Sequence, residues 1–124
     1  MTQDTSQIKE KGYKKLLAWQ KADELVYQIY LETKKFPRDE IFGITSQIRR
    51  VALSVPTNIV EAMGRQSKGE MKQFLNIGLG SLAETEYLIE FSKRLKYIDE
   101  KTFHQLEGLR KEVGALLWGL YKSF

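Results

Sequence analysis

The sequence has no cysteine and only one histidine, His104. The absence of cysteine excludes disulfide bonds and thiolate metal sites, and it fits a cytoplasmic protein. A di-iron bundle would need two Glu-x-x-His pairs, and a nucleophilic triad would need His104 as its committed base. We therefore expect His104 to be a surface imidazole, and the protein to be a non-enzyme with neither metal nor cofactor.

Long hydrophobic runs are also missing. No stretch approaches the roughly 18 uncharged apolar residues that a membrane span requires. The N-terminus lacks the apolar segment of a signal peptide. The sequence thus predicts neither secretion nor a membrane partner.

Charge of either sign is moderate. The chain has 20 lysines and arginines against 16 acidic residues, a formal net charge of +4, which is mild for a nucleic-acid-binding protein. Residues 1–16 carry four lysines against two acids. This segment is predicted to be either a basic N-terminal arm or a solvated, frayed tail.

Glycine and proline divide the 124 residues into four amphipathic segments without an internal repeat. The expected helices cover residues 17–35, 39–64, 67–95 and 99 onward. Ser67 and Glu70 have the spacing of a capping box, and Asp99 is a candidate N-cap. Short connections favour antiparallel neighbours, so the predicted fold is all-α, an up-down-up-down four-helix bundle over residues 17–124.

Pro56 lies in the middle of the second predicted helix, where proline removes a hydrogen bond to Ala52 and costs about 3 kcal/mol. We expect a kinked helix in which the hydroxyls of Ser54 and Thr57 re-satisfy freed backbone groups. The alternative is a break into two helices at Val55, because the residue before proline avoids the helical region.

The second predicted helix has more faces than one core requires. Beside its apolar stripe lies a polar row of Gln47, Arg50, Ser54, Asn58, Glu61 and Arg65. Leu53 and Val60 lie with Arg49 on the side of the helix away from the apolar stripe. They are either singly exposed apolar residues or part of a subunit interface. Glu84 of the third helix could meet Arg50 or Arg65 across that interface. The candidate interface residues are Leu53, Ser54, Asn58, Val60, Glu61 and Glu84.

Two glycine-containing segments fail as nucleotide-binding motifs. "GRQSKGE", residues 64–70, has Glu70 where a phosphate-binding loop requires lysine, and no strand precedes it. "GLGS", residues 78–81, lies inside a predicted helix and has Ala83 in place of the third glycine. These glycines are better explained by close helix packing.

The stretch from "WQKADELVYQIY" to "VPTNIVEAMGR" carries a set of landmarks over about residues 17–98. They are Trp19, Lys21-Ala22, Phe36-Pro37, Glu40, Phe42-Gly43, Gln47-Ile48-Arg49-Arg50, Ser54-Val55-Pro56, Asn58-Ile59, Glu61, Gly64-Arg65, Phe74-Leu75 and Gly80-Ser81-Leu82. With these landmarks the chain resembles a small four-helix-bundle family, labelled ribosomal, that is encoded by intervening sequences in bacterial large-subunit ribosomal RNA genes. Val60, Ala62 and Thr85 depart from the usual pattern but leave the charged landmarks intact.

The resemblance implies a homo-oligomer, in known relatives a ring of five bundles. The family is also similar to the accessory protein of diversity-generating retroelements, a basic pentameric bundle that engages reverse transcriptase and nucleic acid.

We hypothesise that the protein binds nucleic acid, with RNA favoured over DNA. The candidate contact residues are Arg49, Arg50, Arg65, Lys14 and Lys15. They are expected to contact phosphates, because the sequence shows no aromatic-rich stacking platform. The alternative for the arginines is pairing with Glu61 and Glu84 at the subunit interface. The alternative for the protein is a scaffold that docks a partner protein such as a reverse transcriptase.

Overall fold

The computed structural model describes residues 12–124, and all regular structure in this range is helical. The elements are η1 (Gly12–Lys15), α2 (Leu17–Thr33), η2 (Arg38–Glu40), α3 (Ile44–Met63), α4 (Lys68–Arg94) and α5 (Glu100–Lys122). The prediction of an all-α fold with four long helices is confirmed. Residues 1–11 of the predicted N-terminal arm lie outside the described residues.

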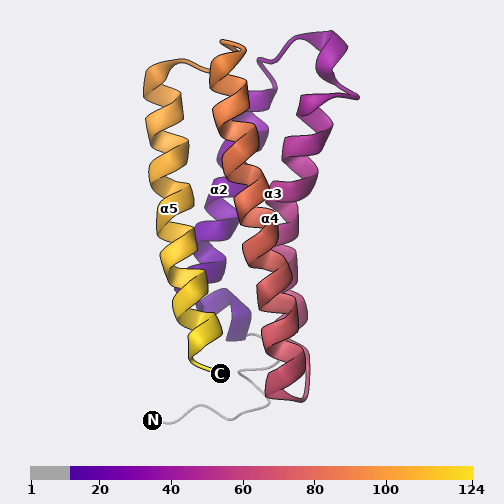
Figure 1. Cartoon of the computed structure of the whole chain (residues 1–124), viewed down its shortest axis with the longest axis vertical. Coiled ribbons are helices and arrows are strands. Elements are labelled where there is room, and N and C mark those ends of the chain that lie inside the picture. The colour runs from indigo at the N-terminus through magenta and orange to yellow at the C-terminus, as the bar shows by residue number, and fades with distance from the viewer. Residues whose placement is uncertain (1–11) are drawn as a thin grey trace.

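The four long helices form a bundle in which each one packs against two others (Figure 1). α3 lies against α2 and α4, and α5 lies against α4 and α2, so α3 and α5 are diagonal neighbours. The contacts between α4 and α5 pair the end of one helix with the start of the other. Lys93 near the end of α4 pairs with Glu100 at the start of α5, whereas Gly78, earlier in α4, lies beside Leu117 late in α5.

The core is built from the apolar stripes whose helical spacing the sequence displays. Leu25, Ile59, Leu75, Ile89 and Leu117, contributed by all four long helices, are each at most 1% exposed. Burying one such side chain stabilises the fold by about 1.5 to 3 kcal/mol. The core therefore extends along the whole bundle and fixes which face of each helix remains for function.

The start of α3 differs from the prediction. The second long helix begins at Ile44 instead of near Asp39, and residues 38–40 form the separate turn η2. The cause is Glu40, whose carboxylate accepts a hydrogen bond from the Tyr97 hydroxyl at 2.7 Å and lies within 3.5 Å of the Ile44 amide. This carboxylate occupies the space that a Cβ on Gly43 would need, so any side chain at residue 43 would displace it.

Pro56 lies inside α3, which is continuous from Ile44 to Met63. The alternative of a break at Val55 is therefore wrong, and the kink stays a prediction. The Thr57 hydroxyl donates to the Leu53 carbonyl at 2.7 Å, and the Asn58 amide donates to the Ser54 carbonyl at 2.7 Å. These bonds tie the backbone on either side of the proline, although they do not involve the carbonyl of Ala52 that the proline leaves without its usual donor.

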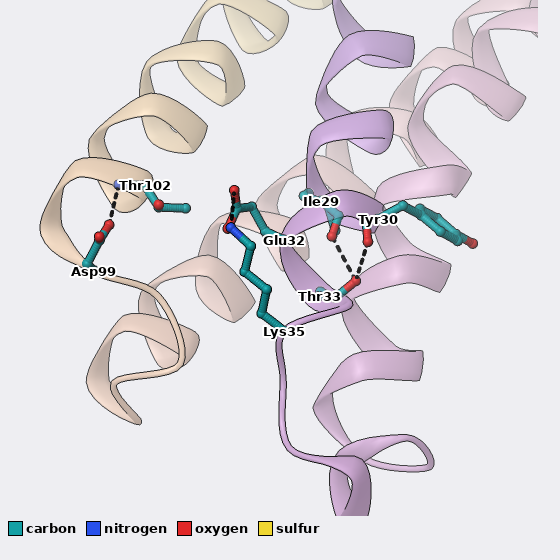
Figure 2. A network of polar contacts seen from close by, with 7 residues as sticks. All are labelled: Ile29, Tyr30, Glu32, Thr33, Lys35, Asp99 and Thr102. Atoms are coloured by element: carbon teal, nitrogen blue, oxygen red, sulfur yellow. Dashed lines mark hydrogen bonds and ion pairs between the residues drawn. The ribbon is translucent and has the colours of Figure 1, made fainter.

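Helix caps fix the ends of the bundle. The Glu70 amide donates to the Ser67 hydroxyl at 3.1 Å, which confirms Ser67 as the N-cap of α4. Figure 2 shows the other end, where Asp99 caps α5 by accepting a hydrogen bond from the Thr102 amide at 2.8 Å. In the same view the Thr33 hydroxyl donates to the Ile29 carbonyl at 2.8 Å and closes the last turn of α2.

Candidate nucleic-acid interface

Basic side chains are concentrated at one end of the bundle. Figure 1 places the turn between α3 and α4 and the last turns of α5 at the lower end, and η1 packs there against α2 and α3. In residues 12–16, 61–72 and 118–124, six basic side chains stand against two acidic ones. The basic ones are Lys14, Lys15, Arg65, Lys68, Lys72 and Lys122. At the opposite end, residues 32–40 and 90–101 carry seven basic and six acidic side chains, an excess of one positive charge against four at the lower end.

Lys14 and Lys15 are presented by an ordered turn. The ring of Tyr13 packs edge-on against Trp19 with centroids 5.1 Å apart, and the Gln20 amide donates to the Lys14 carbonyl at 2.8 Å. These contacts fix η1 on the start of α2 while both lysine side chains remain exposed. The two predicted contact residues of the arm are thus part of the folded body.

Arg65 follows α3 at the same end. Its guanidinium donates to Glu61 at 2.8 Å and lies 4.5 Å from the centroid of the Phe74 ring. The Arg65 side chain is 40% exposed, and that of Glu61 is 49% exposed. The pairing that was predicted across a subunit interface therefore exists within one chain, and its exposure leaves Arg65 accessible to a ligand.

The guanidinium of Arg49 is held by contacts with a neighbouring helix. Its Nε donates to the Thr33 hydroxyl at 2.8 Å, and its guanidinium lies 4.8 Å from the centroid of the Tyr30 ring. Both partners belong to α2, so Arg49 connects α3 to α2 in the upper half of the bundle. The sequence analysis grouped Arg49 with Arg65, but the two residues are sixteen positions apart, which corresponds to about 24 Å along a helix.

Arg50 is exposed and donates to the Gln47 side chain of its own helix at 3.1 Å. It lies on the predicted polar row, one residue after Arg49, and is equally distant from the lower end. The structure therefore brings Lys14, Lys15 and Arg65 to one end of the bundle and leaves Arg49 and Arg50 apart from them.

The predicted interface residues of α3 fall into two groups. Leu53 and Val60 are 46% and 37% exposed on the outer surface of the helix. Ser54 and Asn58 are instead half-buried and hydrogen-bonded to each other at 2.9 Å. The Ser81 hydroxyl of α4 donates to Ser54 at 2.8 Å, so this second group holds α3 to α4 within one chain.

Glu84 lies exposed on α4, in a shallow groove that Gln47 of α3 also lines. The groove is bordered by Tyr87 and Leu88. Glu84 is therefore accessible from solvent, and its place at a subunit interface stays a prediction, because the described chain brings no arginine of the polar row into this groove.

A charged cluster between α4 and α5 was not predicted from the sequence. Arg110 donates to Glu86 at 2.9 Å and to Glu107 through Nε at 3.1 Å, with a further close contact between Nη2 and Glu107. The side chains of Arg110 and Glu107 are only 14% and 11% exposed. The hydrogen bond to Glu107 raises the pKa of Arg110 above its ordinary value. The three-residue spacing of Glu107 and Arg110 was the available signal, but only packing shows that Glu107 is buried and Arg110 half-buried.

An aromatic pair near the basic end corrects one sequence-based expectation. The rings of Trp118 and Tyr121 are stacked, with centroids 5.4 Å apart and planes 11° apart. Lys122 lies 5.6 Å from the Trp118 centroid, and Lys72 of α4 lies 4.8 Å from the Tyr121 centroid. The sequence "WGLYK" contained this spacing, but we expected no aromatic platform because the sequence shows no aromatic-rich stretch.

His104 is exposed and lies 3.2 Å from the Glu100 carboxylate. In the part of the chain that the structure describes, no three histidine or acidic side chains gather as metal ligands. Within residues 12–124, no helix is both long and apolar enough to cross a membrane.

Comparison with known proteins agrees with the resemblance drawn from the landmarks. A family model described as "23S rRNA-intervening sequence protein" matches residues 14–119. Among solved structures, the chain is similar to a protein from Bacteroides thetaiotaomicron, described as a protein with unknown function from the S23 ribosomal protein family. The two share 29% sequence identity and a TM-score of 0.79, over 86% of this chain and 96% of that one. No curated protein matches the sequence. The chain therefore belongs to the 23S rRNA-intervening sequence protein family.

Proposed function

We propose that the protein is a non-enzymatic, oligomeric four-helix bundle that binds RNA through the basic end of each subunit. The observation that carries this proposal is the excess of positive charge at that end, on elements whose position is fixed. Lysine and arginine bind nucleic acid mainly by neutralising phosphates and releasing counterions. The link of the family to 23S ribosomal RNA supports RNA over DNA as the ligand.

The phosphate contacts are assigned to Lys14, Lys15 and Arg65. The two lysines are exposed on η1, and Arg65 is accessible even in its ion pair with Glu61. Arg49 is excluded from this set because its guanidinium is held by Thr33 and Tyr30. Arg50 is exposed but would need a ligand that also reaches up the side of α3.

In this proposal, self-association increases the affinity for RNA, because it brings several basic ends together on one assembly. Leu53 and Val60 place an apolar strip on the outer surface of α3, and Glu84 lies on the neighbouring helix. A cyclic assembly through this face, with the ring of five that the resemblance implies, would place identical basic ends on the same side of the ring. Several weak phosphate-binding sites on one assembly then act together on one RNA.

The test is a titration of a fluorescent, structured RNA with wild-type protein at several salt concentrations. The triple variant Lys14→Ala/Lys15→Ala/Arg65→Ala should bind more weakly and with a shallower dependence on salt, by about 0.7 to 0.9 in slope for each lost phosphate contact. The matched control is Lys34→Ala/Arg38→Ala/Lys101→Ala, which removes the same charge from exposed positions at the opposite end. Equal losses in the two variants would show that net charge alone matters and would refute the assigned site. Light scattering verifies that each variant keeps its mass.

A second candidate function is docking of a partner protein such as a reverse transcriptase. Phe42, in the turn before α3, is 94% exposed, and its neighbour Ile41 is 50% exposed. Adjacent exposed apolar residues that form a contiguous patch mark protein contact sites. A nuclease-insensitive complex with the purified partner that is lost in Phe42→Ser, together with absence of RNA binding, would favour this function.

A further inference from the structure

Trp118 is an unusual surface residue for a charged helix face. The residue is 47% exposed although tryptophan has the largest apolar side chain, and its ring stacks on Tyr121 at 5.4 Å. The neighbouring positions Ala115 and Gly119 carry little or no side chain, and a Cβ at Gly119 would meet nothing within 4 Å. The stacked pair is therefore accessible from solvent.

Lysines surround the stacked rings. Lys122 lies over Trp118 and Lys72 lies over Tyr121, at 5.6 and 4.8 Å from the ring centroids. Lys111 precedes Trp118 by seven residues, so it lies on the same face of α5, about 10 Å along the helix. Together with Lys68, one turn before Lys72 in α4, these residues make the seam between the two helices basic as well as aromatic.

This combination matches the chemistry of unpaired nucleotides. Each base has a flat face that stacks on an aromatic ring, and each phosphate carries the charge that lysine recognises. In a duplex the base faces are already stacked on one another, so only single-stranded segments can use the rings. A purely apolar partner would gain nothing from the lysines.

The geometry points to a binding site for single-stranded RNA on the α4–α5 seam, in which an unpaired base replaces the Lys122 ammonium over the Trp118 ring while Lys72 and the displaced Lys122 contact the flanking phosphates. This inference rests on the proposed RNA-binding function and adds the class of RNA. The site is compatible with assembly through α3, because α5 lies diagonally across the bundle from that helix (Figure 1).

The affinity experiment compares a labelled twelve-nucleotide oligouridine with a duplex RNA at one salt concentration. Trp118→Leu keeps the apolar bulk but removes the aromatic face, and it should weaken oligouridine binding by about five- to a hundredfold, the range for one stacked base. Its affinity for duplex RNA should not change. Trp118→Tyr should retain most of the single-strand affinity.

The matched control is Tyr87→Leu. Tyr87 is 62% exposed and stacks on Phe91 at 6.0 Å, but its groove contains Glu84 in place of the lysines. Loss of this exposed ring should leave oligouridine affinity unchanged. An equal loss in Tyr87→Leu would show a general effect of surface aromatics and would overturn the assignment to Trp118.

A spectroscopic arm detects the stacking itself. The chain has two tryptophans, so Trp19→Phe leaves Trp118 as the sole indole. Oligouridine should quench its fluorescence, whereas duplex RNA and polyphosphate at equal charge should quench it far less.

The outcomes separate the two proposals. Equal quenching by polyphosphate, or unchanged oligouridine affinity in Trp118→Leu, overturns the stacking site and leaves phosphate binding at the basic end intact. If wild-type protein binds neither RNA at low salt, the proposed function and the stacking site both fall.

Discussion

Replacing Arg110 by methionine should destabilise the bundle, because it removes one partner of an ion pair that is largely shielded from solvent. Methionine keeps much of the apolar length of arginine but leaves Glu107, whose side chain is 11% exposed, without its cation. Breaking one partner out of a buried pair costs about 3 to 5 kcal/mol. Because Glu86 at the outer edge is 40% exposed and solvated, we expect the lower end of that range, about 3 kcal/mol.

The assay is urea denaturation at neutral pH and fixed protein concentration, because self-association would make the apparent stability depend on concentration. The double variant Arg110→Met/Glu107→Leu should recover much of the loss, since an apolar pair can replace a buried ion pair. Glu86→Gln is the control and should cost no more than about 1 kcal/mol, as expected for an exposed partner. A cost of Arg110→Met below about 0.5 kcal/mol, or additive effects in the double variant, would refute the reasoning.

Three further predictions concern the helix ends and the two faces of α3. Arg49→Met should lower the free energy of unfolding by about 1 kcal/mol, through loss of its hydrogen bond to Thr33, while the salt dependence of RNA binding stays unchanged in the titration. Leu53→Asp/Val60→Asp should reduce the mass in light scattering to that of a single chain with an unchanged helical circular dichroism spectrum, and an intact oligomer would reject the proposed α3 interface. Asp99→Ala should lower the thermal midpoint at neutral pH, because the hydrogen bond from the Thr102 amide lowers the pKa of Asp99 below its ordinary value of 3.8. A lowered folded-state pKa means that this stabilisation is present above pH 3.8 and is lost as the pH falls through the folded pKa, so the midpoints of wild type and variant should converge in acid.

The sequence was sufficient to predict the helices because their signals are local. Apolar spacing marked the buried faces, and the caps at Ser67 and Asp99 marked the starts of α4 and α5, as the structure confirms. The start of α3 was misplaced because the deciding contact, from Tyr97 to Glu40, joins residues that are far apart in the sequence. The sequence around Glu40 carries no sign of this hydrogen bond, because its donor Tyr97 lies in the connection between α4 and α5.

The candidate site divides in the same way. Sequence alone identified Lys14, Lys15 and Arg65 as basic candidates. It could not assign Arg49, because the partners of this residue lie on α2. It also missed the contact of Lys72 with the aromatic pair, because Lys72 and Tyr121 meet only when α4 packs against α5.

The sequence by itself therefore determined the four helices, their buried faces and the total charge, since each depends on the spacing of residues along one helix. Only the tertiary structure decided where that charge collects and which side chains are accessible. Packing four helices side by side places residues 12–16, 61–72 and 118–124 at one end of the bundle, where six basic side chains meet two acidic ones. The local sequence pattern does not encode which helix ends lie next to each other. Helix packing therefore decides that the positive charge of a mildly basic chain collects at one end.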